Sequence, residues 1–329
     1  MAGIFEPRAA VKELLQGGAP ARPLFLPVVF SLAARVENVP LRAFLGNATK
    51  ITNGLRQVRG HLRADAITCC FDPFLEAEAL GAALDWKTDD GPAALAWPGR
   101  GQGSDGLPPG LRAPEDAATS GHVPVAVEVI KRMKATARDT LLMAAVTGPF
   151  TLAAHLSGDQ AGGATCAALE VAGATAAAVA RALLEAGVDV LVIREGDFGA
   201  NLGANERKAG HSQTEVAVNI IRFYEALPIL LLAPSARRSA APEPGLGFDC
   251  IVCTEMAHAD RCAMAPERCG LALPVESFRS EGEFAQMKQE LQSTLEGMVP
   301  AVVTTSGDFP AAAKVKHLAE IGAAVMALR

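Results

Sequence analysis

Residues 141–193 decide the fold, and within them three pieces matter: LLMAAVT at 141–147, ATCAALEVAGATAAAVARALLEA at 164–186 and VDVLVI at 188–193. The first and third are short apolar runs of the kind that form buried strands. The piece between them is longer, rich in Ala, and follows the 3.6-residue period of a helix. The stretch therefore predicts a strand, a covering helix and a second strand parallel to the first.

The same alternation extends in both directions along the chain. Six further strand-like runs lie at 24–30, 66–71, 229–233, 250–254, 271–275 and 301–305. Further helical stretches lie at 41–62, 125–138, 214–226, 282–298 and 311–328. Eight apolar strands joined by helices predict an α/β fold, a parallel (β/α)8 TIM barrel, with a doubly wound open sheet as the alternative.

Composition narrows the class of protein. The chain has 329 residues, of which 50% are hydrophobic and 20% charged, so it can bury a large core. Its net charge is −6, no dense run of Lys and Arg is present, and aromatic residues make up 5%, which argues against nucleic-acid binding. Because no Pro- and Gly-rich linker divides the pattern, we expect residues 1–329 to form one domain.

Apolar segments and cysteines indicate the cellular compartment of the protein. No apolar stretch approaches the ~20 residues of a bilayer span, and the N-terminus has no signal-peptide core, so we expect a cytoplasmic protein without a membrane helix. The cysteines number seven, which is odd, and Cys69 and Cys70 are adjacent in an apolar run. Reduced thiols suit this pattern better than a disulfide framework. His61, His211 and His317 lie in or beside helical stretches and are expected at the surface or at helix ends.

Residues 85–122 break the alternation between the second and third strands. This interval contains a segment rich in Gly and Pro at 98–109. A long insert at this point in a barrel opens over the C-terminal face, where active sites lie. Residues 85–122 are therefore a candidate lid, and a surface loop without a role is the alternative for 101–110.

Polar residues that follow the strands are the candidates for chemistry, because the loops there converge on one pocket. The candidates for catalysis are Asp72, His155, Glu195, Asp197 and Asp308. The candidates for substrate binding are Ser31, Arg35, Arg194, Ser235, Arg237 and Glu276. Guanidinium groups beside carboxylates suit an anionic substrate and a proton transfer, whereas salt bridges and helix caps at strand ends are the alternative.

Five segments resemble the uroporphyrinogen decarboxylase superfamily. They are AARVENVPLRAFL at 33–45, FDPFLEAEALG at 71–81, GPFTLAAHLSG at 148–158, GVDVLVI at 187–193 and SGDFP at 306–310. The superfamily includes corrinoid-dependent methyltransferases that act on thiols such as coenzyme M. The resemblance implies a (β/α)8 barrel with a pocket for a tetrapyrrole or a corrinoid (cobalamin) at the carboxyl ends of the strands.

The chain departs from the decarboxylases in that superfamily. Asp72 stands at the position of their pyrrole-binding aspartate, but His155 stands where a tyrosine is expected and Asp308 where a histidine is expected. Their Arg-Gln-Ala-Gly-Arg type segment corresponds here to Phe30-Ser31-Leu32-Ala33-Ala34-Arg35, which has a single arginine. These differences argue against ordinary porphyrinogen decarboxylation.

The chain also departs from the thiol methyltransferases. Those relatives resemble one another in a zinc site of His-x-Cys after strand five and a Cys after strand eight, which holds the thiol as a thiolate. Here the segments read Leu-Ala-Pro-Ser at 232–235 and Gly-Asp at 307–308. Cys250 and Cys253 are no substitute, because residues three apart in a strand point to opposite faces. No metal, and in particular no zinc, is therefore expected.

Three functional hypotheses remain open. The first is a corrinoid-linked methyltransferase or demethylase without the zinc-thiolate site, in which a side chain protonates the leaving group of a methyl donor. The second is a lyase that decarboxylates a tetrapyrrole, and the third is a non-catalytic barrel that binds a tetrapyrrole or corrinoid. The candidate partners are a small-molecule or tetrapyrrole ligand, a corrinoid protein and a second copy in a homodimer.

Overall fold

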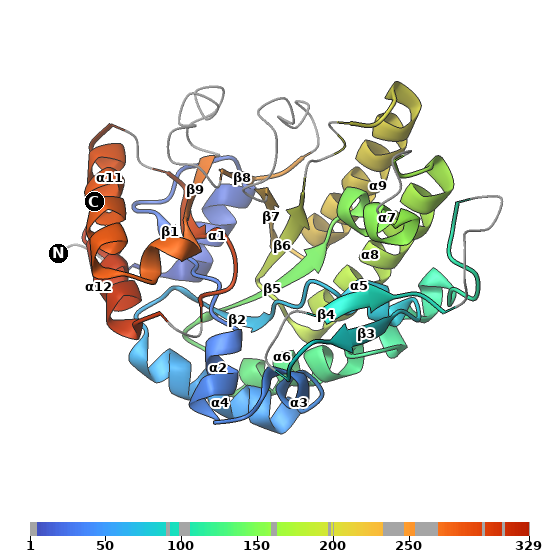
Figure 1. The fold of residues 1–329 in the computed structure, drawn as a ribbon. Helices are drawn as coiled ribbons and strands as arrows, with labels where there is room; N and C mark the ends of the chain where they lie inside the picture. The colour runs from blue at the N-terminus through green and yellow to red at the C-terminus, as the bar shows by residue number, and fades with distance from the viewer. Residues whose placement is uncertain are drawn as a thin grey trace.

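A computed structural model describes residues 5–89, 93–98, 106–158, 163–196, 199, 201–232, 247–253, 269–297, 300–310 and 313–328. Eight parallel strands form one sheet in the order β1-β10-β9-β8-β7-β6-β5-β2 and curve into a nearly closed barrel (Figure 1). These strands are β1 Leu24–Phe25, β2 Ala66–Cys70, β5 Leu141–Thr147, β6 Val190–Glu195, β7 Leu227–Leu232, β8 Cys250–Cys253, β9 Cys269–Leu273 and β10 Val302–Thr305. The predicted (β/α)8 barrel is confirmed, and the open doubly wound sheet is excluded.

Helices connect the strands and cover the outside of the barrel. In chain order they are α1 Pro7–Leu15, α2 Ser31–Val36, α3 Leu41–Leu45, α4 Ala48–His61, α5 Leu75–Ala79, α6 Val123–Thr136, α7 Pro149–Ser157, α8 Cys166–Ala186, α9 Ala204–Phe223, α11 Glu281–Gly297 and α12 Val315–Met326. The helix expected over 41–62 is divided in two, because Asn47 caps α4 by accepting a hydrogen bond from the backbone N–H of Lys50 at 3.0 Å.

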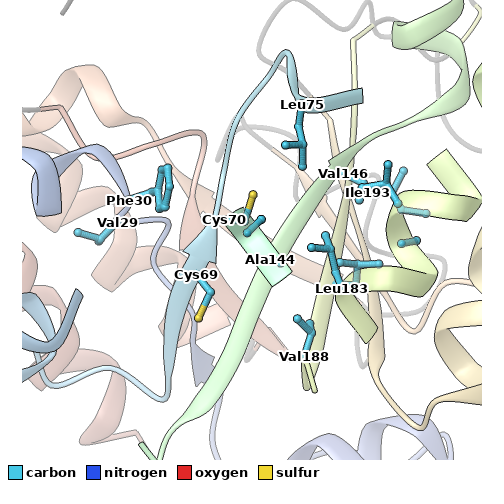
Figure 2. Close-up of a cluster of buried hydrophobic side chains, with 14 of the residues drawn as sticks. Val29, Phe30, Cys69, Cys70, Leu75, Ala144, Val146, Leu183, Val188 and Ile193 are labelled. Atoms are coloured by element: carbon cyan, nitrogen blue, oxygen red, sulfur yellow. The ribbon is translucent and has the colours of Figure 1, made fainter. Parts of the chain in front are cut away.

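Two apolar layers hold these elements together. Inside the barrel, side chains of alternate strand residues fill the axis, and Val11 and Leu14 of α1 close its amino-terminal end. Outside, the opposite faces of the strands pack against the helices. Figure 2 shows part of this outer layer, in which Ala144, Val146 and Ile193 of β5 and β6 lie beside Leu183 of α8. Each strand is thus buried on both faces, which is why its sequence is a continuous apolar run.

The strands β1 and β2 lie side by side without a ladder of hydrogen bonds. Strand β1 ends at Phe25, earlier than the expected residue 30, and Pro27 beyond it has no N–H to donate. Two polar side chains of the β2 segment bridge this seam. The Asp65 carboxylate accepts the Phe25 N–H at 2.8 Å, and the Thr68 hydroxyl accepts the Val29 N–H at 3.4 Å and donates to the Pro27 carbonyl at 3.2 Å. These side chains complete the closure of the barrel together with one backbone hydrogen bond, from the Asp65 N–H to the Phe25 carbonyl at 2.9 Å.

The insert contains an antiparallel hairpin of β3 Ala83–Trp86 and β4 Ala93–Ala96, followed by a short helix, η1 Pro114–Thr119. Directly after β4, the indole N–H of Trp97 donates to the His155 carbonyl of α7 at 2.9 Å. The hairpin begins two residues before the expected start of the insert at residue 85. A lid role for 85–122 stays a prediction.

Two helices bear on the expectations about membrane helices and histidines. By length and composition alone α8 could cross a membrane, although no such helix was expected, but 61% of its most apolar window is buried. It is packed between α7, α9 and β5, so its apolar character is that of a core helix. His317 is buried rather than exposed, stacked on Phe284 with ring centroids 3.9 Å apart. The cytoplasmic location stays a prediction.

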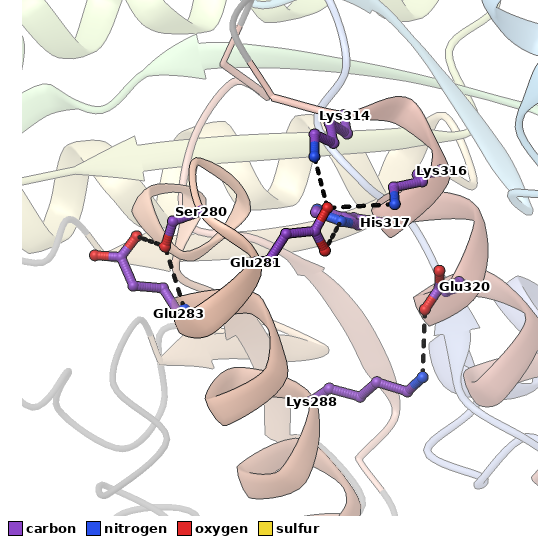
Figure 3. Close-up of polar contacts among 8 residues, drawn as sticks. All are labelled: Ser280, Glu281, Glu283, Lys288, Lys314, Lys316, His317 and Glu320. Atoms are coloured by element: carbon purple, nitrogen blue, oxygen red, sulfur yellow. Dashed lines mark hydrogen bonds and ion pairs between the residues drawn. The ribbon is translucent and has the colours of Figure 1, made fainter.

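The carboxylate of Glu281 joins the beginnings of α11 and α12 (Figure 3). Its oxygens lie 2.6 Å from Lys314 Nζ, 3.3 Å from Lys316 Nζ and 3.0 Å from His317 Nε2. Hydrogen bonds from Lys314 and then from Lys316 lower the pKa of Glu281 to about 2. This cluster lies on the outer helical layer and fixes the last helix of the chain.

The cysteines do not all follow the expectation of reduced thiols. Cys69, Cys70, Cys166 and Cys250 are free. Cys269, at the start of β9, is disulfide-bonded, which corrects that expectation for one position.

Asp65 offers a test of the seam. Its carboxylate, 4% exposed, also accepts two hydrogen bonds from Arg22, at 2.7 and 2.9 Å. Replacing Asp65 with Ala leaves the Phe25 N–H without an acceptor and leaves the largely buried Arg22 guanidinium with only the Pro23 carbonyl, so we expect the free energy of unfolding to fall by about 3 kcal/mol in urea denaturation. The control is Asp139→Ala, which removes an exposed partner of Arg59 and should cost less than about 1 kcal/mol. Equal losses would contradict a closing role for Asp65.

Candidate active site

Three charged side chains come together where β2, β5 and β6 end. Asp72 lies two residues after β2, Glu76 lies in α5, and Arg194 is the fifth residue of β6. The Asp72 Oδ1 accepts the Phe74 N–H at 2.9 Å. This bond turns the chain directly from β2 into α5, as short Asp side chains commonly do. One turn thus positions both acidic residues at the carboxyl end of the barrel, where barrel enzymes place their active sites.

The two carboxyl groups have oxygens that nothing in the described part of the chain satisfies. Asp72 is 6% exposed and its Oδ2 has no hydrogen-bond partner among the described residues. Glu76 is fully buried and, within the same residues, neither of its oxygens has a partner at normal hydrogen-bond geometry, although its own backbone and Thr147 lie close enough to favour its charged form. A buried polar group without a partner costs about 1–3 kcal/mol, and proteins keep such groups mainly where they serve function.

The electrostatics of the cluster favour proton transfer. Burial raises the pKa of Glu76 to about 7, although Thr147 and the Arg194 guanidinium favour its charged form. Burial likewise raises the pKa of Asp72. Burial lowers the pKa of Arg194, while the charges of Glu76 and Asp72 act in the opposite direction. The Arg194 guanidinium lies over the ring of Phe71, 4.7 Å from its centroid.

Glu195 and Asp308 sit at the starts of helices. Glu195 accepts the N–H of Phe150 at 3.1 Å, and the N–H and hydroxyl of Thr151 at 2.8 and 2.6 Å, all at the start of α7. Gly148 leaves room for this carboxylate, which a Cβ at residue 148 would overlap. Asp308, in the loop after β10, accepts the N–H of Phe30 and of Ser31, each at 2.8 Å, at the start of α2.

This capping geometry agrees with the alternative that strand-end carboxylates hold helices. Burial raises the pKa of Asp308 to about 6 despite its hydrogen bonds to the backbone of Phe30 and Ser31. Both oxygens of each carboxylate are engaged with backbone donors. A catalytic role for Glu195 or Asp308 stays a prediction.

The other candidates are spread around this cluster. His155 is half-buried in α7, with its ring 6.1 Å from that of Phe74. Ser31 is half-buried at the start of α2, whereas Arg35 and Glu276 are exposed. Asp197, Ser235 and Arg237 lie outside the described residues.

Sequence reasoning placed Asp72 and Arg194 at the site but missed Glu76. The signal was present, because Glu76 lies four residues after Asp72 within FDPFLEAEALG. We expected functional residues only directly after strands, and Glu76 lies on a helix.

Metal ligands do not gather in the described part of the structure. No group of three His, Cys, Asp or Glu residues there is arranged to hold a metal ion. The absence of zinc stays a prediction.

Comparisons with known proteins agree with this architecture. The family model of uroporphyrinogen decarboxylase (URO-D) matches residues 7–205, more than half of the 329 residues. The chain belongs to the uroporphyrinogen decarboxylase family. A solved structure, a methyltransferase from Methanosarcina mazei, is similar to this member of the family with a TM-score of 0.80 and 17% sequence identity, over 98% of this chain and 99% of that one. No curated protein matches the chain.

The capping role of Asp308 predicts a loss of stability. In Asp308→Ala the N–H groups of Phe30 and Ser31 lose their acceptor, so we expect the free energy of unfolding to fall by about 2 kcal/mol. Urea denaturation measures the change, with the exposed Asp116→Ala as the control. A fall of less than about 0.5 kcal/mol would show that water replaces the carboxylate.

Glu76 predicts a pH dependence of stability. Its pKa is about 7 in the folded protein and lies lower, near 4.5, when the chain is unfolded, so its ionisation opposes folding. The Glu76 contribution to stability is therefore lost as the pH rises from about 4.5 through 7, by about 3 kcal/mol in total. We compare the free energy of unfolding of Glu76→Gln with that of the wild type by urea denaturation. Between pH 5 and pH 8 this difference should shift in favour of the variant. The exposed Glu290→Gln should keep the wild-type dependence, and an unchanged dependence in Glu76→Gln would contradict the raised pKa.

Proposed function

We propose that this protein is a methyltransferase of the uroporphyrinogen decarboxylase family that removes a methyl group from a small donor and passes it to a corrinoid. The observation that carries the proposal is the pair of buried carboxyl groups, Asp72 and Glu76, with unsatisfied oxygens beside Arg194 at the carboxyl end of the barrel. Unsatisfied buried acceptors next to a cation suit a small polar ligand that brings its own hydrogen-bond donors.

Glu76 is the general acid in this proposal. A side chain with a pKa near the working pH is the most effective proton donor, and the Glu76 pKa of about 7 meets that condition. The donor's heteroatom keeps the electron pair of its broken bond to the methyl carbon and takes the proton of Glu76. Glu76 then becomes a carboxylate, which the charge of Arg194 stabilises.

Asp72 and Arg194 position the donor. The free Oδ2 of Asp72 can accept a hydrogen bond from it, and Arg194 can donate to an oxygen or another acceptor. Phe71 holds the Arg194 guanidinium from its other side. The buried setting excludes water, which strengthens each of these interactions.

A corrinoid fits the donor set of this end of the barrel. Its peripheral amide groups are hydrogen-bond donors, and the unpartnered Oδ2 of Asp72 is an acceptor. When bound, the cobalt of the corrinoid supplies the nucleophile that accepts the methyl group. The Methanosarcina mazei methyltransferase of similar fold supports a methyl-transfer reaction, and the lack of a His-x-Cys segment supports an acceptor other than a zinc-bound thiol.

One observation favours a second candidate, a lyase that decarboxylates a tetrapyrrole. The free Oδ2 of Asp72, at the position of the pyrrole-binding aspartate of the decarboxylases, can accept pyrrole N–H groups. Against it, burial raises the pKa of Asp72, which weakens the anion that such a mechanism needs. Arg35 is exposed on α2, so it offers little to a buried substrate carboxylate.

In the experiment the purified protein is mixed with cob(I)alamin and with one methyl donor at a time. The donors are a methoxy compound, a methylamine and a methylthio compound. Methyl transfer changes the visible spectrum of the cobalamin. We expect turnover with one donor class, and a loss of ~100-fold or more in Glu76→Gln, because general acids contribute that much. The exposed Glu320→Gln is the control and should match the wild type.

Other outcomes separate the hypotheses. Wild-type rates in Glu76→Gln would contradict its role as the acid. Release of CO2 from uroporphyrinogen, measured with the same preparation, would favour the lyase. Binding of cobalamin or porphyrin without any turnover would favour a non-catalytic barrel.

A further inference from the structure

Arg194 lies on the inner side of the barrel at its carboxyl end. Val190 and Val192 of the same strand belong to the apolar layer inside the barrel. Because side chains alternate along a strand, Arg194 faces the same side. Its neighbours in the sheet are Thr147 of β5 and Leu231 of β7. Neither carries a charge, so the sheet itself gives the guanidinium no ionic partner.

The guanidinium of Arg194 makes no hydrogen bond and no ion pair within the described residues. Its aromatic contact is with the ring of Phe71, 4.7 Å away. A ring contact of this kind engages the charge of a guanidinium but offers no oxygen to its five N–H donors. Because Arg194 is half-buried, water reaches these donors only in part. The structure thus holds a cation at the site with its donors available.

The nearby carboxyl groups balance this cation incompletely. Burial raises the pKa of Glu76 to about 7 and also raises the pKa of Asp72, so both acids favour their neutral forms more than exposed carboxyls do. Glu195, a third acid whose charge acts on Arg194, is engaged with N–H groups at the start of α7. A partly buried cation in such surroundings is stabilised by an anion that comes from outside the chain.

We propose that Arg194 binds a carboxylate of the methyl donor, so that the substrates of this protein are small methylated acids. The inference rests on the proposed function and adds the chemical class of its substrate. A guanidinium and a carboxylate are both planar and form two parallel N–H···O hydrogen bonds, which fix the position and the orientation of the donor. One arginine balances one negative charge, which favours a monocarboxylate over a phosphate or a polycarboxylate.

A bound carboxylate also suits the proton transfer. The positive charge of Arg194 favours the carboxylate form of Glu76, so an anion that cancels this charge favours the protonated form. Glu76 therefore holds its proton while the donor is bound. After the transfer, the substrate carboxylate and the new Glu76 carboxylate share one cation, and their repulsion favours release of the demethylated acid.

Ligand binding tests the proposal without a corrinoid. Isothermal titration calorimetry at about pH 6, where Glu76 is mostly protonated, compares methylated acids with their uncharged amides. The pairs are methoxyacetate with methoxyacetamide, para-methoxybenzoate with para-methoxybenzamide, and the matching methylthio and methylamino compounds. We expect at least one acid to bind ~10-fold or more tightly than its amide, because hydrogen bonds between charged groups are the stronger ones. Amides that bind as tightly as the acids in every pair would overturn the proposal.

Variants of Arg194 locate the anion. Arg194→Gln should lose the preference for the acid, whereas Arg56→Gln, which removes an exposed guanidinium from α4, should keep it. Arg194→Lys keeps the charge without the paired N–H groups, so its preference should lie between those of the wild type and Arg194→Gln. A preference that survives in Arg194→Gln would place the anion elsewhere and overturn the proposal.

Stability distinguishes a binding role of Arg194 from a structural one. Because its guanidinium makes no hydrogen bond or ion pair with the described residues, Arg194→Gln should unfold at a urea concentration close to that of the wild type. A loss of stability as large as that of Asp65→Ala would make Arg194 a structural counter-ion of Asp72 and Glu76, and the proposal would be wrong.

Methyl transfer to cob(I)alamin separates this inference from the proposed function. If acids bind through Arg194 but no donor transfers its methyl group, methyl transfer is rejected and the carboxylate site at Arg194 stands. If the protein demethylates the uncharged amides as fast as the matching acids, methyl transfer stands and the assignment of its substrate class is overturned.

Discussion

Hydrogen bonds from backbone N–H groups to strand-end carboxylates hold both ends of this barrel. At the amino-terminal end Asp65 accepts the Phe25 N–H, and Asp189 accepts the Leu142 N–H at 2.8 Å. At the carboxyl end Glu195 holds the start of α7 and Asp308 the start of α2. In each case one carboxylate, buried at Asp65 and Glu195 and partly buried at Asp189 and Asp308, satisfies donors that lie on the segment of a neighbouring strand. The cost of its burial is offset by the bonds that fix the register.

Asp72 and Glu76 stand out against this pattern. Their unpartnered oxygens are not needed to hold any helix or strand in the described structure, and they lie at the end of the barrel that in this fold carries chemistry. The scaffold and the site therefore use the same residue types in opposite ways. Carboxylates that are fully hydrogen-bonded fix the geometry, and in the proposed function the carboxyl groups with unsatisfied oxygens provide the proton and a place for the ligand.

The chain keeps the architecture of the uroporphyrinogen decarboxylase family but lacks two sets of functional groups found in its relatives. Neither the second arginine of the decarboxylase segment after β1 nor the His-x-Cys of the thiol methyltransferases is present. What remains is one guanidinium, Arg194, and two acids, which fit a small donor better than a polyanionic tetrapyrrole. The proposed methyl transfer with a protonated leaving group requires no other side chains than these, because in that reaction a corrinoid would supply the nucleophile.

The sequence by itself determined the eight strands, their helices and hence the barrel. Apolar periodicity is a local pattern that can be recognised without knowing any tertiary contact. It also placed Asp72 and Arg194 together at the carboxyl end of the barrel, since residues at strand ends share one face of a barrel. Only the tertiary structure decided that Glu195 and Asp308 cap helices, because their donors come from segments distant in sequence. The placement of Glu76 also depended on the tertiary structure. A glutamate on a helix faces solvent or the core according to how that helix packs, and α5 packs so that Glu76 is buried.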